Sequence, residues 1–217
     1  MRIFNFTKGL LLFAIILIYS IKTQAQINTI TLQPGGTEGK DASVHSFYPN
    51  INFGTNQCLN AVCWTNSGTK YITRSLMQFD LSSIPAGSIV TDAKLSLYFL
   101  EAWSGMEQSS LSGSNETVLR RITQNWDEST VVWANQPTFT TINQVSLPQS
   151  TNPYQDYTDI DVTTLVNDMI NFENYGFELQ LKTEDYYRAV SFASSDYTTV
   201  IKRPLLVVKI PMQSMGH

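Results

Sequence analysis

Two pairs of neighbouring acidic residues are candidates for acid–base chemistry. Asp127 and Glu128 form one pair, and Glu184 and Asp185 form the other. Two carboxyl groups on either side of a glycosidic bond can act as acid and base, so these pairs admit a glycosidase. The alternative for the first pair is to tie a loop through side-chain to backbone hydrogen bonds, which is what Asp127, Ser129 and Thr130 can do together. The second pair lies in a turn beside two tyrosines.

Other common catalytic arrangements find little support. The chain has two histidines, His45 and the C-terminal His217, so a Ser-His-Asp triad or a zinc site lacks the residues it needs. A glycine-rich segment ends in Gly39-Lys40, but Asp41 follows where a phosphate-binding loop requires Ser or Thr. The sequence therefore favours binding over catalysis.

A binding site needs only side chains that project from a sheet or a loop. Aromatic rings stack on sugar faces, while Arg and Lys can bind the carboxylates of uronic acids. The candidates at outward-facing positions are Arg74, Gln78, Tyr98, Trp103, Arg121 and Lys182. Each could also be an ordinary solvated side chain, and Arg74 could pair with Asp80 or another acid. The hypothesis is the set as a whole.

The first 25 residues have the features of a secretory signal. Arg2 and Lys8 give a basic start, an apolar run from Leu10 to Ile18 follows, and Ala25 offers a small residue for cleavage. The run is too short to span a membrane well, because about 20 residues are needed. We expect residues 26–217 to form a single secreted domain that has no membrane association after cleavage.

The charge balance argues against nucleic acid as a partner. Residues 1–25 hold three of the 14 basic residues and none of the 18 acidic ones, so the remaining chain carries a net charge of −7. Non-specific binding to phosphates requires a basic field, which this chain lacks.

Four residues could form structural cross-links. In an oxidising compartment the closely spaced Cys58 and Cys63 predict a short disulfide, with two buried thiols as the alternative. Asp41 and Asp196 lie near the first and last strands, and their oxygens suit a structural calcium ion. An ordinary capping role is the alternative for each aspartate.

Alternation of apolar and polar residues predicts many short strands and few helices. The predicted strands are residues 27–32, 42–47, 59–64, 70–81, 94–99, 118–123, 177–182, 188–193 and 204–210. One amphipathic helix is expected over residues 161–171, and residues 101–115 read as a long surface loop. The stretch from Arg74 to Phe99 predicts a strand, a corner at Pro85 and Gly87, and a second strand. This pattern indicates an all-β, jelly-roll β-sandwich with one short helix.

Several motifs in this order resemble one known family. The chain reads Arg-Ser-Leu-x-x-Phe-Asp-Leu-Ser-x-Ile-Pro-x-Gly from Arg74, and Trp-x-Glu-x-Thr-Val-x-Trp-x-x-Gln-Pro from Trp126. Glu-Gly-Lys-Asp-Ala begins at Glu38, and Tyr-Pro-Asn-x-Asn-Phe-Gly begins at Tyr48. Together they resemble the DNRLRE-type domains, which include carbohydrate-binding module family ninety-six. The resemblance covers about residues 32–210.

The resemblance implies a jelly-roll fold and non-catalytic binding of an acidic polysaccharide such as alginate. The chain differs from the relatives in its acidic balance and in having Gln78 where a basic residue is frequent. The competing hypotheses are a structural or adhesive spacer at a cell surface and a polysaccharide lyase. The Gln-x-His and Tyr-x-Lys-x-Gly-x-Tyr patterns of jelly-roll alginate lyases are absent from the sequence.

Overall fold

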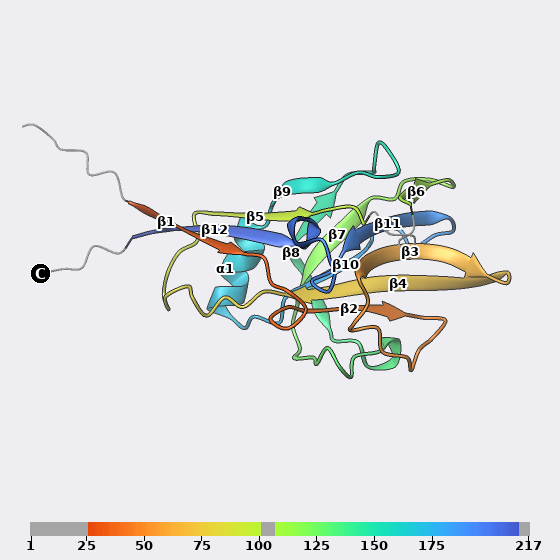
Figure 1. Cartoon of the computed structure of the whole chain (residues 1–217), viewed down its shortest axis with the longest axis horizontal. Coiled ribbons are helices and arrows are strands. Elements are labelled where there is room, and N and C mark those ends of the chain that lie inside the picture. Colours follow the sequence, from red (N-terminus) through yellow and green to blue (C-terminus); the bar gives the residue numbers. More distant parts are fainter. Residues whose placement is uncertain (1–25, 101–106, 213–217) are drawn as a thin grey trace, which may run out of the picture.

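A computed structural model describes residues 26–100 and 107–212, which form two antiparallel sheets (Figure 1). The smaller sheet has the order β1 (Ile27–Leu32), β12 (Leu205–Pro211), β5 (Asp92–Leu97) and β9 (Tyr157–Asp161). The larger sheet has the order β6 (Ser109–Ser110), β11 (Arg188–Ala193), β3 (Cys58–Asn66), β4 (Thr69–Gln78), β10 (Phe177–Leu181), β7 (Thr117–Ile122) and β8 (Phe139–Leu147). An eighth strand, β2 (Lys40–His45), also pairs with β4. The predicted all-β sandwich is confirmed.

The main hydrophobic core draws on both sheets. Met77 and Phe177 of the larger sheet and Leu95 and Leu206 of the smaller one belong to a single buried cluster. Burying one such side chain stabilises the fold by roughly 1.5–3 kcal/mol, so this cluster is the main source of stability. The expected alternation is confirmed in β4 and beyond, where Met77 and Phe79 are buried while Gln78 is only partly so.

The predicted strand, corner and strand connect the two sheets. β4 lies in the larger sheet and β5 in the smaller one, so the turn around Pro85 carries the chain across the core. Ile84 and Val90 on either side of this turn are buried in the core. Gly87 has a φ of +77°, which a glycine adopts without strain.

The β3–β4 hairpin projects at the end of the molecule opposite the helix (Figure 1). Its strands are paired up to Asn66 and Thr69, which leaves Ser67 and Gly68 as the turn. Both have positive φ, +49° and +82°, as a tight two-residue hairpin turn requires.

A second apolar cluster lies outside the main core. Leu76 and Met77 are adjacent on β4 and point to opposite faces, so only Met77 joins the main core. Leu76 instead joins Ile122, Trp126 and Val131 in the second cluster. The segment 123–137, named here the Trp loop, is therefore packed on the outer face of the larger sheet.

The helix begins two residues later than predicted. α1 (Thr163–Asn171) buries Leu165, Val166 and Met169, and the Asp161 carboxylate accepts hydrogen bonds from the Thr163 backbone (3.0 Å) and hydroxyl (2.7 Å). Two short 3-10 helices, η1 (Trp133–Asn135) and η2 (Val200–Lys202), complete the elements. None of the helices within residues 26–100 and 107–212 has the length and apolarity to cross a membrane.

The sequence pattern missed three strands, which are the two-residue β6 within the predicted loop 101–115 and the longer β8 and β9. β8 and β9 are each at the edge of a sheet, and most of their residues are exposed or half-buried. An edge strand buries little apolar surface, so it lacks the strict alternation that identifies a half-buried strand. β8 is further disrupted by a register shift opposite Leu119 and Arg121.

The structure contradicts the predicted disulfide. Cys58 and Cys63 are both free and buried, and both lie on β3. Five steps along a strand separate their Cα atoms by roughly 17 Å, whereas a disulfide requires less than about 7 Å. The two buried thiols considered as the alternative are what the structure contains.

We expect a reducing agent to leave the midpoint of thermal unfolding unchanged, because there is no disulfide to break. Burial raises the pKa of both thiols, so a thiol reagent should react with them only after unfolding. The check is a thiol titration of native and denatured protein. A lower midpoint under reducing conditions would contradict the structure.

Candidate functional site

The predicted ligand-binding residues do not form one surface. Arg74 and Gln78 lie on β4 of the larger sheet, whereas Tyr98 follows β5 of the smaller one. Arg121 lies near the end of β7, with its guanidinium 5.1 Å from the centre of the Phe172 ring beside α1. Trp103 and residues 1–25, over which a secretory signal is predicted, lie outside the described residues. Lys182 is exposed, and its ammonium lies 2.8 Å from the Glu116 carboxylate.

Arg74 is held by an acid distant in sequence. Its guanidinium donates two hydrogen bonds to the Glu184 carboxylate, at 2.7 and 3.0 Å, and a third to the Gln136 side chain at 3.2 Å. It also lies 5.0 Å from the centre of the Trp133 ring. Arg74 therefore pairs with an acid, which was the alternative to ligand binding, but that acid is Glu184. Asp80 instead accepts a hydrogen bond from the Ser82 backbone. Only 18 % of the Arg74 side chain is exposed, because its neighbours cover most of it.

Behind Arg74 lies a buried carboxyl group. Glu178 on β10 is 2 % exposed, and neither of its side-chain oxygens has a hydrogen-bond partner. The nearest cation is Arg74 at 4.0 Å. Desolvation raises the pKa of Glu178 to about 7, and the charges of Arg74 and Arg120 only partly oppose that rise.

On one side of Arg74, a lysine and several rings are exposed. The Lys70 ammonium donates a hydrogen bond to the Glu184 backbone carbonyl at 2.8 Å and lies 5.0 Å from the Tyr186 ring centre. Tyr186 is 40 % exposed and contacts Tyr187, which in turn packs edge-on against Trp64. No carboxylate of the described residues lies within ion-pair distance of Lys70. This cation is therefore available to an anionic ligand.

On the other side, a second group of rings surrounds His45. The imidazole stacks on Tyr71 at 4.5 Å and contacts Tyr48, which is 39 % exposed. The Ala134 backbone donates a hydrogen bond to the Pro49 carbonyl at 3.0 Å, so this group is attached to the Trp loop. We call the combined area, at the hairpin end of the larger sheet, the hairpin surface. It comprises Tyr48, Lys70, Tyr71, Arg74, Trp133 and Tyr186.

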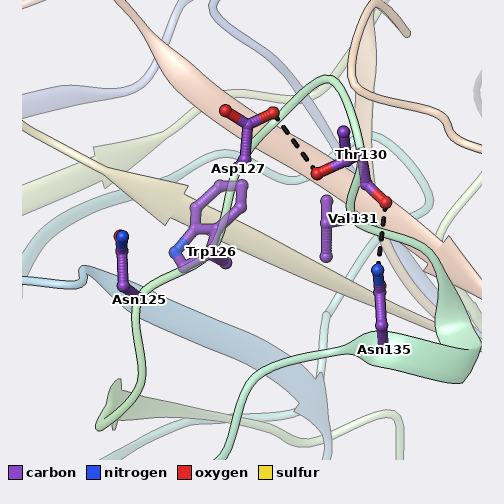
Figure 2. Close-up of a pocket in the computed structure, with 6 residues that line it drawn as sticks. All are labelled: Asn125, Trp126, Asp127, Thr130, Val131 and Asn135. Atoms are coloured by element: carbon purple, nitrogen blue, oxygen red, sulfur yellow. Dashed lines mark hydrogen bonds between the residues drawn. The ribbon is translucent and has the colours of Figure 1, made fainter.

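The Trp loop itself encloses a shallow pocket (Figure 2). The pocket has a volume of about 280 Å³, and its lining residues are Asn125, Trp126, Asp127, Thr130, Val131 and Asn135. Most of its polar groups already have partners within the loop. Asp127 accepts a hydrogen bond from the Ser129 backbone (2.9 Å), and Asn135 bonds both the Val132 N–H (2.7 Å) and the Thr130 carbonyl (3.2 Å). Trp126 donates its indole N–H to the Tyr175 carbonyl. The predicted tying role of Asp127 is confirmed.

Neither acidic pair presents two free carboxyl groups. In the first pair, Asp127 ties the loop while Glu128 accepts a hydrogen bond from the Asp41 backbone at 2.8 Å. In the second, Glu184 binds Arg74, and Asp185 lies 3.6 Å from the Arg188 guanidinium. Each of the four acids is therefore held by a contact with another residue of the chain.

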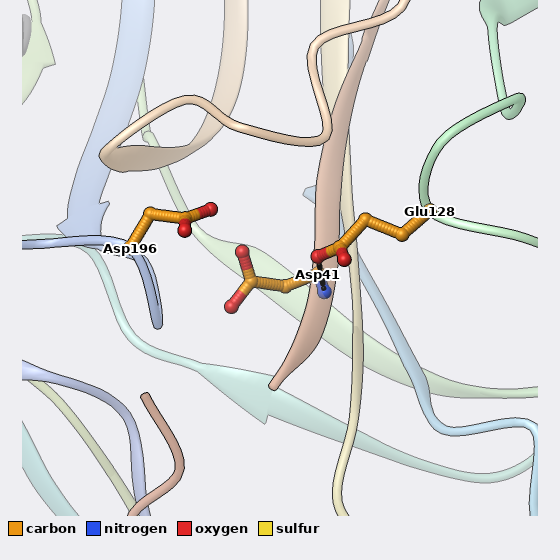
Figure 3. Close-up of side chains that lie close together, drawn as sticks. All are labelled: Asp41, Glu128 and Asp196. Carbon is orange, nitrogen blue, oxygen red and sulfur yellow. Dashed lines mark hydrogen bonds between the residues drawn. The ribbon is translucent and has the colours of Figure 1, made fainter. Parts of the chain in front are cut away.

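The two aspartates proposed as calcium ligands are neighbours in space. Asp41 and Asp196 lie close together, with Glu128 as a third acid (Figure 3). From the sequence alone, Glu128 is a candidate only as the partner of Asp127 in a carboxylate pair. The signal that could have identified it is its place in a Trp-x-Glu motif, but the motif does not show what the side chain faces.

We expect Glu178→Gln to stabilise the protein more at pH 8 than at pH 5. The folded-state pKa is raised, so the stability contributed by the neutral carboxyl is complete below about pH 4.5 and lost as pH rises through about 7. Glutamine does not titrate, so the variant avoids this loss. The carboxyl faces Arg74, Arg120 and Glu184, which are unchanged.

The gain at pH 8 should be of order 1–3 kcal/mol in the free energy of unfolding, measured by chemical denaturation at both pH values. Glu38→Gln, at an exposed position, is the matched control. An equal effect of Glu178→Gln at both pH values would contradict the assignment.

Comparison with known proteins places the fold in a family. The model of the family described as Carbohydrate-binding module family 96 matches residues 35–210, which is most of the chain. No curated protein matches the sequence significantly. The matched region includes β2 to β11, all but the last residue of β12, the Trp loop and the hairpin surface. The chain belongs to carbohydrate-binding module family 96.

Proposed function

We propose that this protein is a secreted, non-catalytic module that binds an acidic polysaccharide such as alginate through the hairpin surface. Family membership supports carbohydrate binding. The observation that carries the location is the pairing of the exposed Lys70 ammonium with the exposed Tyr186 ring, 5.0 Å apart. The secretory features of residues 1–25 support an extracellular site of action.

The chemistry of this pair suits a uronic acid residue. The apolar face of a pyranose ring can stack on the Tyr186 ring, and the neighbouring carboxylate can accept a hydrogen bond from Lys70. A neutral sugar could stack on the Tyr186 ring but has no carboxylate to accept a hydrogen bond from Lys70. Lys70 therefore gives the surface its preference for acidic glycans.

Arg74, the partly buried member of the hairpin surface, supports this pair. Its two hydrogen bonds hold Glu184, whose backbone carbonyl receives the Lys70 ammonium. It also faces Trp133 of the Trp loop. Arg74 is thus a positioning residue that links the 184–187 turn to the loop.

The structural roles of the acidic pairs support a protein that binds without cleaving. Asp127, Glu184 and Asp185 are each held by a hydrogen bond or an ion pair with another residue of the chain. Incubation with polysaccharide should therefore produce no new reducing ends and no unsaturated ends. The appearance of either kind of end would revive a glycosidase or a lyase.

The direct test is a binding panel of alginate, pectin and neutral glucans, by affinity electrophoresis and calorimetry. We expect the acidic polysaccharides to bind more tightly than the glucans. Binding of neutral glucans alone would contradict the uronate preference. Absence of binding to every polysaccharide would favour a structural or adhesive spacer.

Point variants then locate the site. Tyr186→Ala should weaken alginate binding about 2- to 12-fold, because a lost ring contact is worth roughly 0.5–1.5 kcal/mol. Lys70→Ala should weaken binding of alginate but not of a neutral glucan that binds.

The matched controls are Phe172→Ala, an exposed ring near α1, and Lys209→Ala, a lysine on the smaller sheet. Neither control should change binding. Loss of binding in a control, with Tyr186→Ala unaffected, would place the site elsewhere.

A further inference from the structure

Three acidic side chains from distant parts of the chain converge at the edge of the larger sheet (Figure 3). Asp41 comes from β2, Glu128 from the Trp loop, and Asp196 from the turn after β11. One oxygen from each residue lies within 4.8 Å of the others. No ion pair joins any of them to a basic side chain among the described residues, although Lys40 and Arg203 lie near enough to influence Glu128 and Asp196.

Two buried polar atoms in this cluster lack partners. Asp41 is 3 % exposed, and its Oδ1 accepts no hydrogen bond, while Oδ2 accepts one from the Ser195 backbone at 2.8 Å. The Ser195 hydroxyl lies beside the same carboxylate, fully buried, without a hydrogen bond of acceptable geometry. Leaving buried oxygens unsatisfied is costly, so the site is suited to a ligand that supplies positive charge.

The surrounding backbone leaves no room for extra side chains. A Cβ on Gly36 would collide with the Asp196 carboxylate, and a Cβ on Gly39 would collide with the Ser195 side chain. The glycine-rich segment 35–39 therefore closes against the cluster. Burial raises the pKa of all three carboxyl groups, and Lys40 and Arg203 oppose that rise only in part at Glu128 and Asp196.

We propose that Asp41, Glu128 and Asp196 bind a calcium ion. Hard oxygen ligands suit either calcium or magnesium, but the donor set favours calcium. Magnesium usually keeps several waters and binds through one or two carboxylates, whereas calcium accepts six to eight oxygens in a flexible geometry. Three carboxylates from separate segments, each with an oxygen within 4.8 Å of the others, resemble a calcium site more closely.

The ion would join β2, the Trp loop and the turn at residues 194–196. Glu128 is the ligand that brings in the Trp loop, which carries Trp133 of the hairpin surface. Calcium is therefore a structural cofactor in this proposal, and its binding does not depend on a glycan.

The test is calorimetric titration of the chelator-treated protein with calcium chloride, without polysaccharide. We expect one site, and an increase of about 5–10 °C in the unfolding midpoint at 100-fold excess over the dissociation constant. Magnesium chloride should bind at least 10-fold more weakly. Absence of heat and of a midpoint shift at millimolar calcium, or an equal response to magnesium, would overturn the proposal.

Conservative variants identify the ligands. Asp41→Asn, Glu128→Gln and Asp196→Asn should each reduce calcium affinity at least 10-fold, and Asp80→Asn, in an exposed turn, should not. Because Asp41→Asn removes an unbalanced buried charge, its unfolding midpoint without calcium at pH 8 should be no lower than that of the wild type. Cooperative unfolding of each variant verifies its fold. Unchanged calcium binding in all three variants would contradict the site.

Discussion

The attachment of the Trp loop to the outer face of the larger sheet is the contact on which the other features depend. Leu76, Trp126 and Val131 form the apolar part of this attachment, separate from the core between the sheets. The loop then places Trp133 against Arg74 and directs Glu128 towards Asp41. Without this packing, neither the hairpin surface nor the acidic cluster would be assembled, because each takes residues from the loop and from the sheet.

Two buried carboxyl groups accompany these two features. Glu178 lies behind Arg74, and Asp41 lies at the centre of the acidic cluster, with a pKa of about 7 for each. Burial of an ionisable group without a full set of partners destabilises a fold, so such groups often accompany functional sites. The main core, by contrast, is apolar and accounts for the stability of the sandwich.

Local pattern predicted most of the fold, because alternation along a strand reports which side chains are buried. The corner around Pro85 and the helix near Asp161 both followed from residue types in sequence. The edge strands β8 and β9 did not, since an exposed edge imposes little alternation. The disulfide prediction was wrong because it took closeness in sequence for closeness in space. An extended strand in fact separates Cys58 from Cys63.

The candidate sites were only partly predictable, since they depend on contacts between distant segments. Arg74 was identified from its strand position, but its partner Glu184 is 110 residues away. The closeness of Asp41 to Asp196 agreed with the sequence analysis, while Glu128 needed coordinates. The most direct test of the glycan-binding claim is nuclear magnetic resonance of the labelled protein during titration with a uronate oligosaccharide. We predict shifts concentrated at Lys70, the Trp133 indole and the turn at Tyr186; shifts confined to the smaller sheet would contradict the account.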